Sequence, residues 1–359
     1  MNTFQLYSTW HRALAQTIPE RCPSRLKNLT WLVVGLYLAM NVQLSAIVRK
    51  WPLLAKNASL TRRLERFLDN PAYRVRDWYE PVARQMLAAF AGREVTLIID
   101  GSKVGFGHQL LMVALAHRRR ALPLAWTWVA RSRGHSSSWT QAALLDYVRR
   151  LLPPGTRVIL VGDAEFGAIP LIGQVRRWRW KYVLREKSNH QVRQHGSRLW
   201  QPFTDLVQKA GQSLWWPRAF LTRKWKYPTA LLAHWAKGHN EPWLLATNLA
   251  DARHVRRAYR RRMWIEELFG DLKGHGLDLE TTHLRHFLRL SRLTLAVCLV
   301  YVWLMHLGQQ TIHAGQRHLV DRHDRRDLSV FRIGRDIADK RFVLYQLIPV
   351  AFQPLLSGG

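Results

Sequence analysis

Two apolar runs that each lead into an aspartate place the strongest constraint on the fold. Residues 95–99 are apolar and largely β-branched and pass directly into Asp100, and residues 158–161 pass through Gly162 into Asp163. Short apolar runs of this kind are typical of buried strands, which belong to sheets covered by helices. The chain is therefore predicted to contain an α/β core in which two strands end in an acidic residue.

The elements between and after these runs indicate the kind of sheet. Two further strand patterns follow Asp100, a helical pattern comes next, and then strand, helix and strand alternate. Three consecutive strands followed by alternating elements predict a mixed sheet with helices packed on it. The expected strands are residues 95–99, 109–117, 122–130, 158–161 and 181–185, and the expected helices are residues 136–152 and 169–180.

The rest of the chain consists of parts that differ in the periodicity of their apolar residues. Helical patterns dominate before the first strand, including an amphipathic basic helix at residues 60–73, and strand patterns recur at 219–222, 229–234 and 243–247. A long helix is expected at 252–274, ended by Gly274 and Gly276, and another at 284–307. The predicted parts are a helical N-terminal region (1–94), the first part of the core (95–185), a β-rich insertion (186–250), a core helix (251–280) and a basic helical C-terminal region (281–359).

The charge of the chain indicates its class of partner. It has 55 Lys and Arg against 24 Asp and Glu, a formal net charge of +31, with basic clusters that include residues 118–120 and 253–262. Such an excess favours a polyanion, either nucleic acid or an anionic membrane surface. The two cysteines, Cys22 and Cys298, are far apart, which argues against a disulfide framework or a structural zinc site and fits a reducing compartment.

A membrane-spanning segment is the alternative explanation for one stretch. Residues 30–48 carry no charge and are long enough to span a bilayer, but they contain Gly35, Asn41 and Gln43 and are basic on both sides. The shorter apolar run at 293–307 follows Arg289 and Arg292. Both runs are interpreted as buried helices of a protein that does not enter the membrane.

The predicted helix at 252–274 carries a stripe of polar side chains beside its apolar face. On a regular helix Tyr259, Arg262, Glu266 and Lys273 fall within about 60° of one another. A phenol, a guanidinium, a carboxylate and an ammonium then share one edge of a core-facing helix. The alternative is an amphipathic helix whose polar residues simply border its apolar face. This alternative does not explain the particular spacing of the four residues.

That spacing carries a resemblance to a known family. Tyr259, Arg262, Glu266 and Lys273 reproduce the Y-(2)-R-(3)-E-(6)-K signature, and the two strand-end aspartates, Asp100 in LIIDGSKV and Asp163 in VILVGDAEFG, match the family's aspartate motifs. Over residues 95–276 the chain resembles the DDE transposases of bacterial insertion sequences, of the insertion-sequence-four type with the YREK signature. The resemblance implies an RNase H-like core that brings the three carboxylates together.

The resemblance also implies a role for each residue. Asp100, Asp163 and Glu266 would be the catalytic residues and the ligands of two Mg²⁺ ions, with Mn²⁺ as a substitute. Carboxylate oxygens suit these hard cations, and two such ions can assist both the attacking and the leaving oxygen of a phosphodiester. Tyr259, Arg262 and Lys273 would contact phosphates of the transposon end, since Arg and Lys both neutralise phosphate.

The expected activity is cut-and-paste DNA transposition by a cytoplasmic, nucleoid-associated bacterial enzyme. Its partners would be the double-stranded DNA of the terminal inverted repeats and of the target, with a homodimer in the DNA complex. The terminal helical regions would bind DNA and dimerise. Lys103, in a glycine-bearing segment without phosphate-loop order, is a further candidate DNA contact near Asp100. Tryptophans that can stack on a flipped base occur in the insertion, at Trp215, Trp216, Trp225, Trp235 and Trp243.

Two other functions share these features. A structure-specific nuclease on the same fold would use the same three carboxylates without joining two DNA ends. A catalytically inactive DNA-binding remnant of a transposase would keep the basic surface but would hold no metal at the carboxylates. Strand-transfer and metal-binding measurements distinguish them.

Overall fold

One sheet runs through the molecule. A computed structural model describes residues 1–105, 107–130 and 136–355, and within them ten strands form a single sheet in the order β3-β2-β1-β4-β5-β10-β9-β8-β6-β7. The strands are β1 Glu94–Val104, β2 His108–His117, β3 Arg120–Val129, β4 Arg157–Gly162, β5 Lys181–Arg185, β6 Gln191–Gln194, β7 Gln201–Pro202, β8 Ser213–Leu221, β9 Tyr227–His234 and β10 Trp243–Thr247.

The first five strands form the mixed sheet that the sequence predicts. β1 is antiparallel to β2 and parallel to β4, β2 is antiparallel to β3, and β4 is parallel to β5. The helices α6 (Ser138–Leu151) and α7 (Ile169–Arg177) connect β3 to β4 and β4 to β5. The predicted α/β class with a mixed sheet and helices packed on it is confirmed, and β5 has the predicted bounds.

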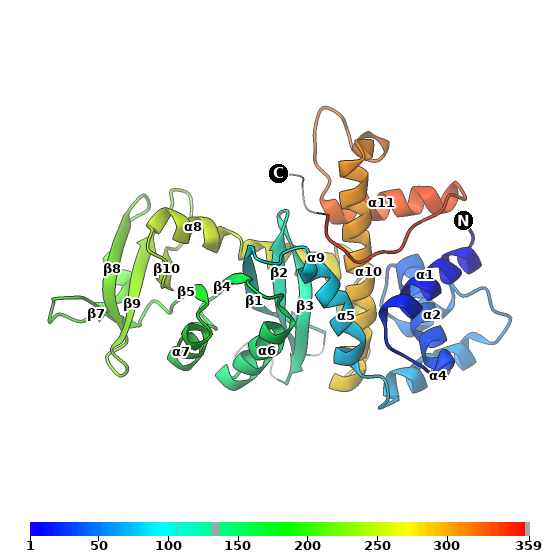
Figure 1. Ribbon diagram of the computed structural model, residues 1–359, viewed down its shortest axis with the longest axis horizontal. Coiled ribbons are helices and arrows are strands. Elements are labelled where there is room, and N and C mark those ends of the chain that lie inside the picture. The colour runs from blue at the N-terminus through cyan, green and yellow to red at the C-terminus, as the bar shows by residue number, and fades with distance from the viewer. Residues whose placement is uncertain (106, 131–135, 356–359) are drawn as a thin grey trace.

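The strands of residues 186–250 extend this sheet and do not form a separate one. β10 pairs antiparallel with β5, and β9, β8, β6 and β7 follow outward (Figure 1). β10 therefore covers the edge of β5, whose backbone N–H and C=O groups would otherwise be unpaired. The sequence patterns locate β10 well but give only the last part of β8.

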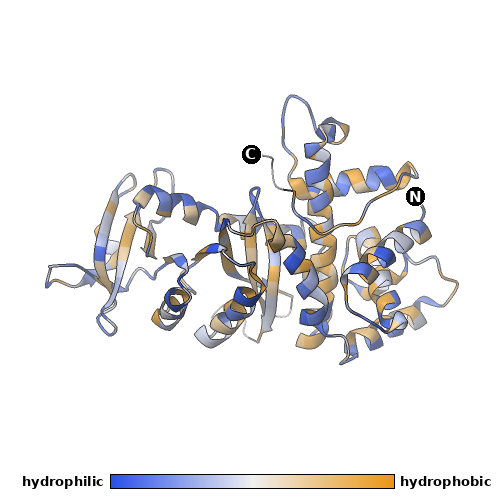
Figure 2. Ribbon diagram, viewed as in Figure 1, coloured by the Kyte–Doolittle hydropathy of each residue, from blue (hydrophilic) through white to orange (hydrophobic). Residues whose placement is uncertain are grey.

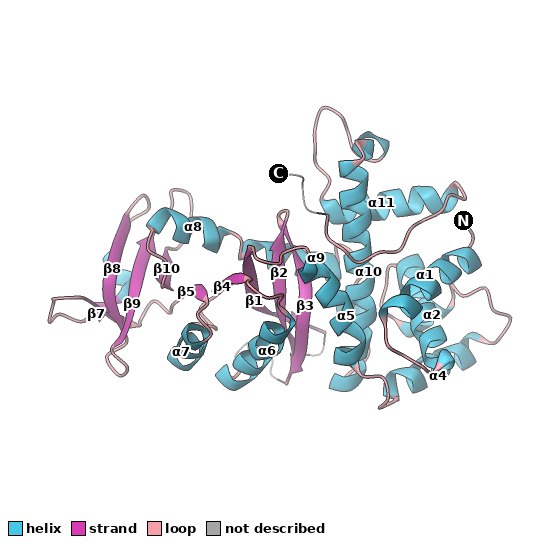
Figure 3. Cartoon of the chain, in the orientation of Figure 1, coloured by secondary structure: helices cyan, strands magenta, loops and turns pink. Residues whose placement is uncertain are grey.

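Helices gather at the end of the molecule opposite β8 and β9, where the N-terminus also lies (Figures 1 and 3). The N-terminal helices pack on one another and on α10, which crosses the helical end. The remaining helices are α1 Thr3–Thr17, α2 Pro23–Ala39, α3 Leu44–Val48, α4 Asn57–Asp69, α5 Val75–Ala88, α8 Ala252–Arg260, α9 Met263–Leu272, α10 Phe287–His313 and α11 Val330–Val343.

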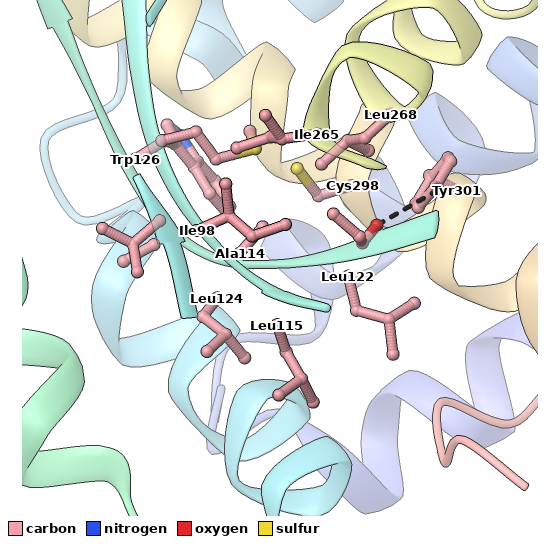
Figure 4. Close-up of a cluster of buried hydrophobic side chains, with 14 of the residues drawn as sticks. Ile98, Ala114, Leu115, Leu122, Leu124, Trp126, Ile265, Leu268, Cys298 and Tyr301 are labelled. Carbon is pink, nitrogen blue, oxygen red and sulfur yellow. Dashed lines mark hydrogen bonds between the residues drawn. The ribbon is translucent and has the colours of Figure 1, made fainter. Parts of the chain in front are cut away.

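The core lies where β1, β2 and β3 meet α9 and α10. Ile265 and Leu268 of α9 pack with Cys298 and Tyr301 of α10 on one side of these strands, and all four are fully buried (Figure 4). The Tyr301 hydroxyl donates to the Ala121 carbonyl at 3.1 Å. Figure 2 shows that hydrophobic residues concentrate in the strands and in α10, whereas α8 is mostly hydrophilic. The core thus fixes α9 against β1.

The apolar runs considered as membrane segments are parts of this core. α10 is long and apolar enough to cross a membrane, but 89% of its most apolar window is buried inside the protein. Residues 30–48 do not form one helix, because α2 ends at Ala39 and Met40 takes a left-handed conformation with φ 47°. The interpretation as buried helices is confirmed for both runs.

α10 and α11 approach so closely that only glycine fits at their contact. A Cβ added at Gly334 would lie 1.8 Å from the Leu304 carbonyl oxygen, and one at Gly308 would lie 2.0 Å from the Val330 oxygen. Backbone atoms cannot move aside as a flexible side chain can, so each glycine is required by close packing.

We expect Gly334→Ala to lower the free energy of unfolding by about 1–3 kcal/mol or more, because the two helices must separate. The matched change Gly173→Ala in α7 meets no atom within 4 Å. That helix should gain up to about 1 kcal/mol from the better helix former. Urea denaturation of both variants measures the difference, and equal stability of the two would contradict the close contact.

Candidate active site

Asp100 and Asp163 lie side by side at the end of the parallel pairing between β1 and β4. The last parallel partners are Ile99 and Gly162, and each aspartate is the next residue. β1 continues in its pairing with β2 as far as Val104, so the prediction that its strand ends at Asp100 is wrong. β4 ends at Gly162, directly before its aspartate. Both aspartates nevertheless occupy equivalent positions, as the sequence predicts.

The predicted helix at 252–274 is in fact two helices. α8 ends at Arg260 and α9 begins at Met263, while the Arg262 and Ile265 amides donate three residues back, to Tyr259 and Arg262 oxygens, in a tightened turn. α8 contacts β4 and β5, whereas α9 contacts β1, β2 and β3. The break between α8 and α9 therefore lies where the chain passes from β4 and β5 to β1, β2 and β3.

Arg261 anchors this break to the sheet. Its Nη1 donates to the Thr96 hydroxyl of β1 at 2.6 Å. The neighbouring Arg262 is thereby placed over the β1–β4 pair, where the aspartates lie. No glycine or proline occurs between Tyr259 and Glu266, so the sequence carries no ordinary sign of a helix break.

Three carboxylates converge on the guanidinium of Arg262. Its Nη2 lies 3.1 Å from Asp100 Oδ2 and 3.9 Å from Asp163 Oδ2, and its Nη1 forms an ion pair with Glu266 Oε1. The Asp100 side chain is 8% exposed, that of Asp163 33% and that of Glu266 44%. The tertiary structure thus joins one residue from a strand, one from a strand end and two from the α8–α9 region.

Burial dominates the electrostatics of Asp100. It raises the pKa of Asp100 to about 7, against the opposing effect of Arg262, while Asp163 and Glu266 contribute in the same direction as burial. Burial acts to lower the pKa of Arg262, but the carboxylates and Tyr259 around it raise that pKa above its ordinary value. Positive charge is therefore favoured at the point where the carboxylates meet.

Tyr259 precedes Arg262 by three residues, near the C-terminal end of α8. The residue is 3% exposed and its ring packs edge-on against Trp243 of β10, with centroids 5.0 Å apart. Burial raises the pKa of Tyr259 to about 12. Trp243, one of the tryptophans considered for base stacking, is thus partly used in packing α8 onto the sheet.

Lys273 and Lys103 lie apart from the carboxylate centre. Lys273 caps the C-terminus of α9, and its Nζ pairs with Glu280 Oε1 at 3.0 Å. Lys103 is exposed on β1, three residues beyond Asp100. Because side chains alternate along a strand, Lys103 and Asp100 face opposite sides of the sheet.

Glu165 is a further acidic residue beside the centre that the sequence patterns do not indicate. Its Oε1 accepts hydrogen bonds from the Ser136 amide and hydroxyl, both at 2.6 Å, and its Oε2 accepts one from Gln109 Nε2 at 3.2 Å. The Glu165 amide donates to Asp163 Oδ1 at 2.9 Å. Glu165 thus ties the loop after β4 to β2 and α6. In the sequence, the feature that points to Glu165 is its position two residues after Asp163.

Arg120 fixes α9 from the other side. Its guanidinium pairs with Asp271 at 3.3 Å and with Glu267 at 3.0 Å. The Arg120 side chain is only 14% exposed, so it does not belong to the basic surface expected at residues 118–120. This pairing holds the helix that carries Glu266 against β3.

The donor set suits a hard divalent cation, because it consists of three carboxylates around a position that already stabilises positive charge. In the arrangement described, however, the guanidinium stands between them. Across residues 1–105, 107–130 and 136–355, no three acidic, histidine or cysteine side chains are grouped closely enough to hold a metal ion.

Comparison with known proteins gives two similarities. A family described as "Transposase DDE domain" matches residues 93–303. Among solved structures, the chain is similar to the piggyBac transposase in its synaptic complex with hairpin DNA, at 9% sequence identity and a TM-score of 0.42, covering 93% of this chain and 76% of that one. No curated protein matches the chain.

Proposed function

Because the chain belongs to the transposase DDE domain family, we propose that it is a cut-and-paste transposase of a bacterial insertion sequence. It cleaves DNA at the terminal inverted repeats of its element and joins the freed ends to target DNA. The observation that carries this proposal is the convergence of Asp100, Asp163 and Glu266, which lie far apart in the sequence, on one point above the sheet.

Asp100, Asp163 and Glu266 would hold the divalent ions, Mg²⁺ or Mn²⁺. When bound, such ions activate the attacking oxygen of a phosphodiester cleavage and stabilise the leaving oxygen. The protein's own contribution is to place the three carboxylates. β1 and β4 fix the two aspartates, and Arg120 fixes the helix of Glu266. The buried Asp100 would anchor the ions, while the more exposed Asp163 and Glu266 face the DNA.

The cationic residues of the signature would hold the DNA backbone. Arg262 offers a planar fork for phosphate oxygens and Lys273 a point charge. Tyr259 would reach a phosphate only with its hydroxyl, because its ring is buried. Lys103, on the opposite face of β1, would contact DNA away from the cleavage point. The net charge of +31 supports double-stranded DNA as the partner.

The assembly would be a homodimer that pairs two transposon ends in the bacterial nucleoid. The helical region of α1–α5 and the basic C-terminal region would bind DNA and dimerise. This division of labour rests on the resemblance to the YREK-type transposases. Short inverted repeats directly outside the gene would identify the element and supply the substrate for cleavage assays.

A strand-transfer assay separates the transposase from a nuclease on the same fold. Pre-cut ends that carry the inverted repeat are incubated with the protein, Mg²⁺ and a supercoiled target plasmid. A transposase joins these ends to the plasmid, because a free 3′-hydroxyl can replace water as the attacking group. Nicking of uncut substrate without any joined product would favour the nuclease instead.

A further inference from the structure

The guanidinium of Arg262 occupies the position at which the three carboxylates converge. We propose that Arg262 is a displaceable counter-ion: it closes the carboxylate centre in the free protein and leaves it for a DNA phosphate. Divalent ions would then bind strongly only to the DNA-bound protein. This inference rests on the proposed function, and it adds that DNA binding controls when the carboxylate centre takes up metal ions.

The contacts make the guanidinium and a metal ion competitors. Both Nη atoms of Arg262 are used by carboxylate oxygens, of Asp100 and Asp163 on one side and Glu266 on the other. A divalent ion at the centre would need the same oxygens and would be repelled by the positive charge. Each therefore excludes the other from the centre.

The position of Arg262 in the chain allows it to leave. The residue lies in the break between α8 and α9, and its Nε is buried without a hydrogen-bond partner among the described residues. An unpaired buried donor makes this arrangement less stable than a fully paired one. Asp163 and Glu266 are partly exposed, so the side chain can swing outward past them while the backbone stays in place.

Binding to a DNA phosphate would stabilise the Arg262 side chain outside the carboxylate centre. A guanidinium binds phosphate oxygens through two parallel hydrogen bonds, which compensates for the lost carboxylate contacts. Its departure leaves three neighbouring carboxylates without a counter-ion, and divalent ions remove that repulsion. DNA binding and metal binding should consequently strengthen each other, and by thermodynamic linkage the two effects are equal.

Manganese affinity measures the competition without any cleavage. Mn²⁺ is titrated into the full-length protein in the absence of DNA, and free Mn²⁺ is followed by electron paramagnetic resonance. Arg262→Gln should bind Mn²⁺ at least about tenfold more tightly than the wild type, because a unit charge in contact with the ligands is removed. Arg262→Gln that binds Mn²⁺ no more tightly than wild type would overturn the proposal.

Arg260→Gln is the matched control. It removes the same charge two residues earlier, from an exposed side chain at the end of α8, and the three carboxylates form their ion pairs with Arg262. Its Mn²⁺ affinity should stay close to that of wild type, and an equal gain in both variants would show a general charge effect and overturn the proposal. If Arg262→Gln does not fold, Arg262→Lys replaces it, because one ammonium group cannot contact all three carboxylates. The Arg262→Lys variant should bind Mn²⁺ more tightly than the wild type. No gain in its Mn²⁺ affinity would again overturn the proposal.

The coupling to DNA is tested on the wild-type protein. A double-stranded oligonucleotide, with the titration of duplex alone subtracted, should tighten Mn²⁺ binding by at least about tenfold, and it should do so much less in Arg262→Gln. No effect of duplex on the wild type overturns the coupling. Competition without DNA cleavage would refute the proposed function alone, whereas cleavage with equal Mn²⁺ affinities would refute this inference alone.

Discussion

Glu266→Gln should lower metal-dependent nicking of inverted-repeat DNA by about a thousandfold or more. The change keeps the size of the side chain and removes the only carboxylate that α9 contributes to the centre beside Arg262. Metal ions stabilise the charge of a phosphodiester transition state by several kcal/mol, and each increase of about 1.4 kcal/mol in the activation barrier lowers the rate about tenfold. Conversion of supercoiled to nicked substrate, followed on gels, measures the loss.

The matched control is Glu267→Gln, the adjacent carboxylate of α9. Glu267 pairs with Arg120 and is 57% exposed, so it does not face the carboxylate centre. Nicking by this variant should stay within a few-fold of wild type, because Arg120 keeps its ion pair with Asp271 of the same helix. Both variants should still bind transposon-end DNA in a fluorescence-anisotropy titration. Unimpaired nicking by Glu266→Gln would remove that residue from the proposed mechanism.

Trp303→Ala should lower the free energy of unfolding by about 3–5 kcal/mol, the cost of deleting a large buried aromatic side chain. Trp303 is fully buried in α10, where its ring packs edge-on against Trp10 of α1 and Tyr37 of α2 at 5.1 and 4.9 Å. Its Nε1 donates to the Pro349 carbonyl at 2.8 Å. One side chain thus joins both ends of the chain to the central helix.

Urea denaturation measures this effect against Trp225→Ala. Trp225 lies between β8 and β9 and is 53% exposed, so its loss should change stability by no more than about 0.5 kcal/mol. Circular dichroism at each urea concentration gives both values. A small, equal effect of the two changes would show that the packing of α10 against the N-terminal helices contributes little.

Much of the core could be predicted from local sequence. The apolar runs before Asp100 and Asp163 are strands because β-branched residues suit buried, pleated backbone, and β4 ends where predicted. The Y-R-E-K spacing identified Arg262, which pairs with both aspartates, and Glu266, which pairs with Arg262. Roles for these residues in catalysis and metal binding remain predictions.

Other features depend on contacts between distant residues. The pairing of β10 with β5, which makes the insertion part of the same sheet, leaves no local signal. The break between α8 and α9 follows from covering two differently placed groups of strands and from the bond of Arg261 to Thr96. A straight helix would put Lys273 in one stripe with Glu266, whereas the structure pairs it with Glu280.

The sequence by itself determined the residue types of the centre, the strands that carry its aspartates and the surplus of positive charge. These properties are local or additive, so periodicity, spacing and counting reveal them. Only the tertiary structure decided that the Arg262 guanidinium lies among Asp100, Asp163 and Glu266. The reason is that the position of this charge depends on how the sheet and the broken helix pack together, and packing joins residues more than a hundred positions apart.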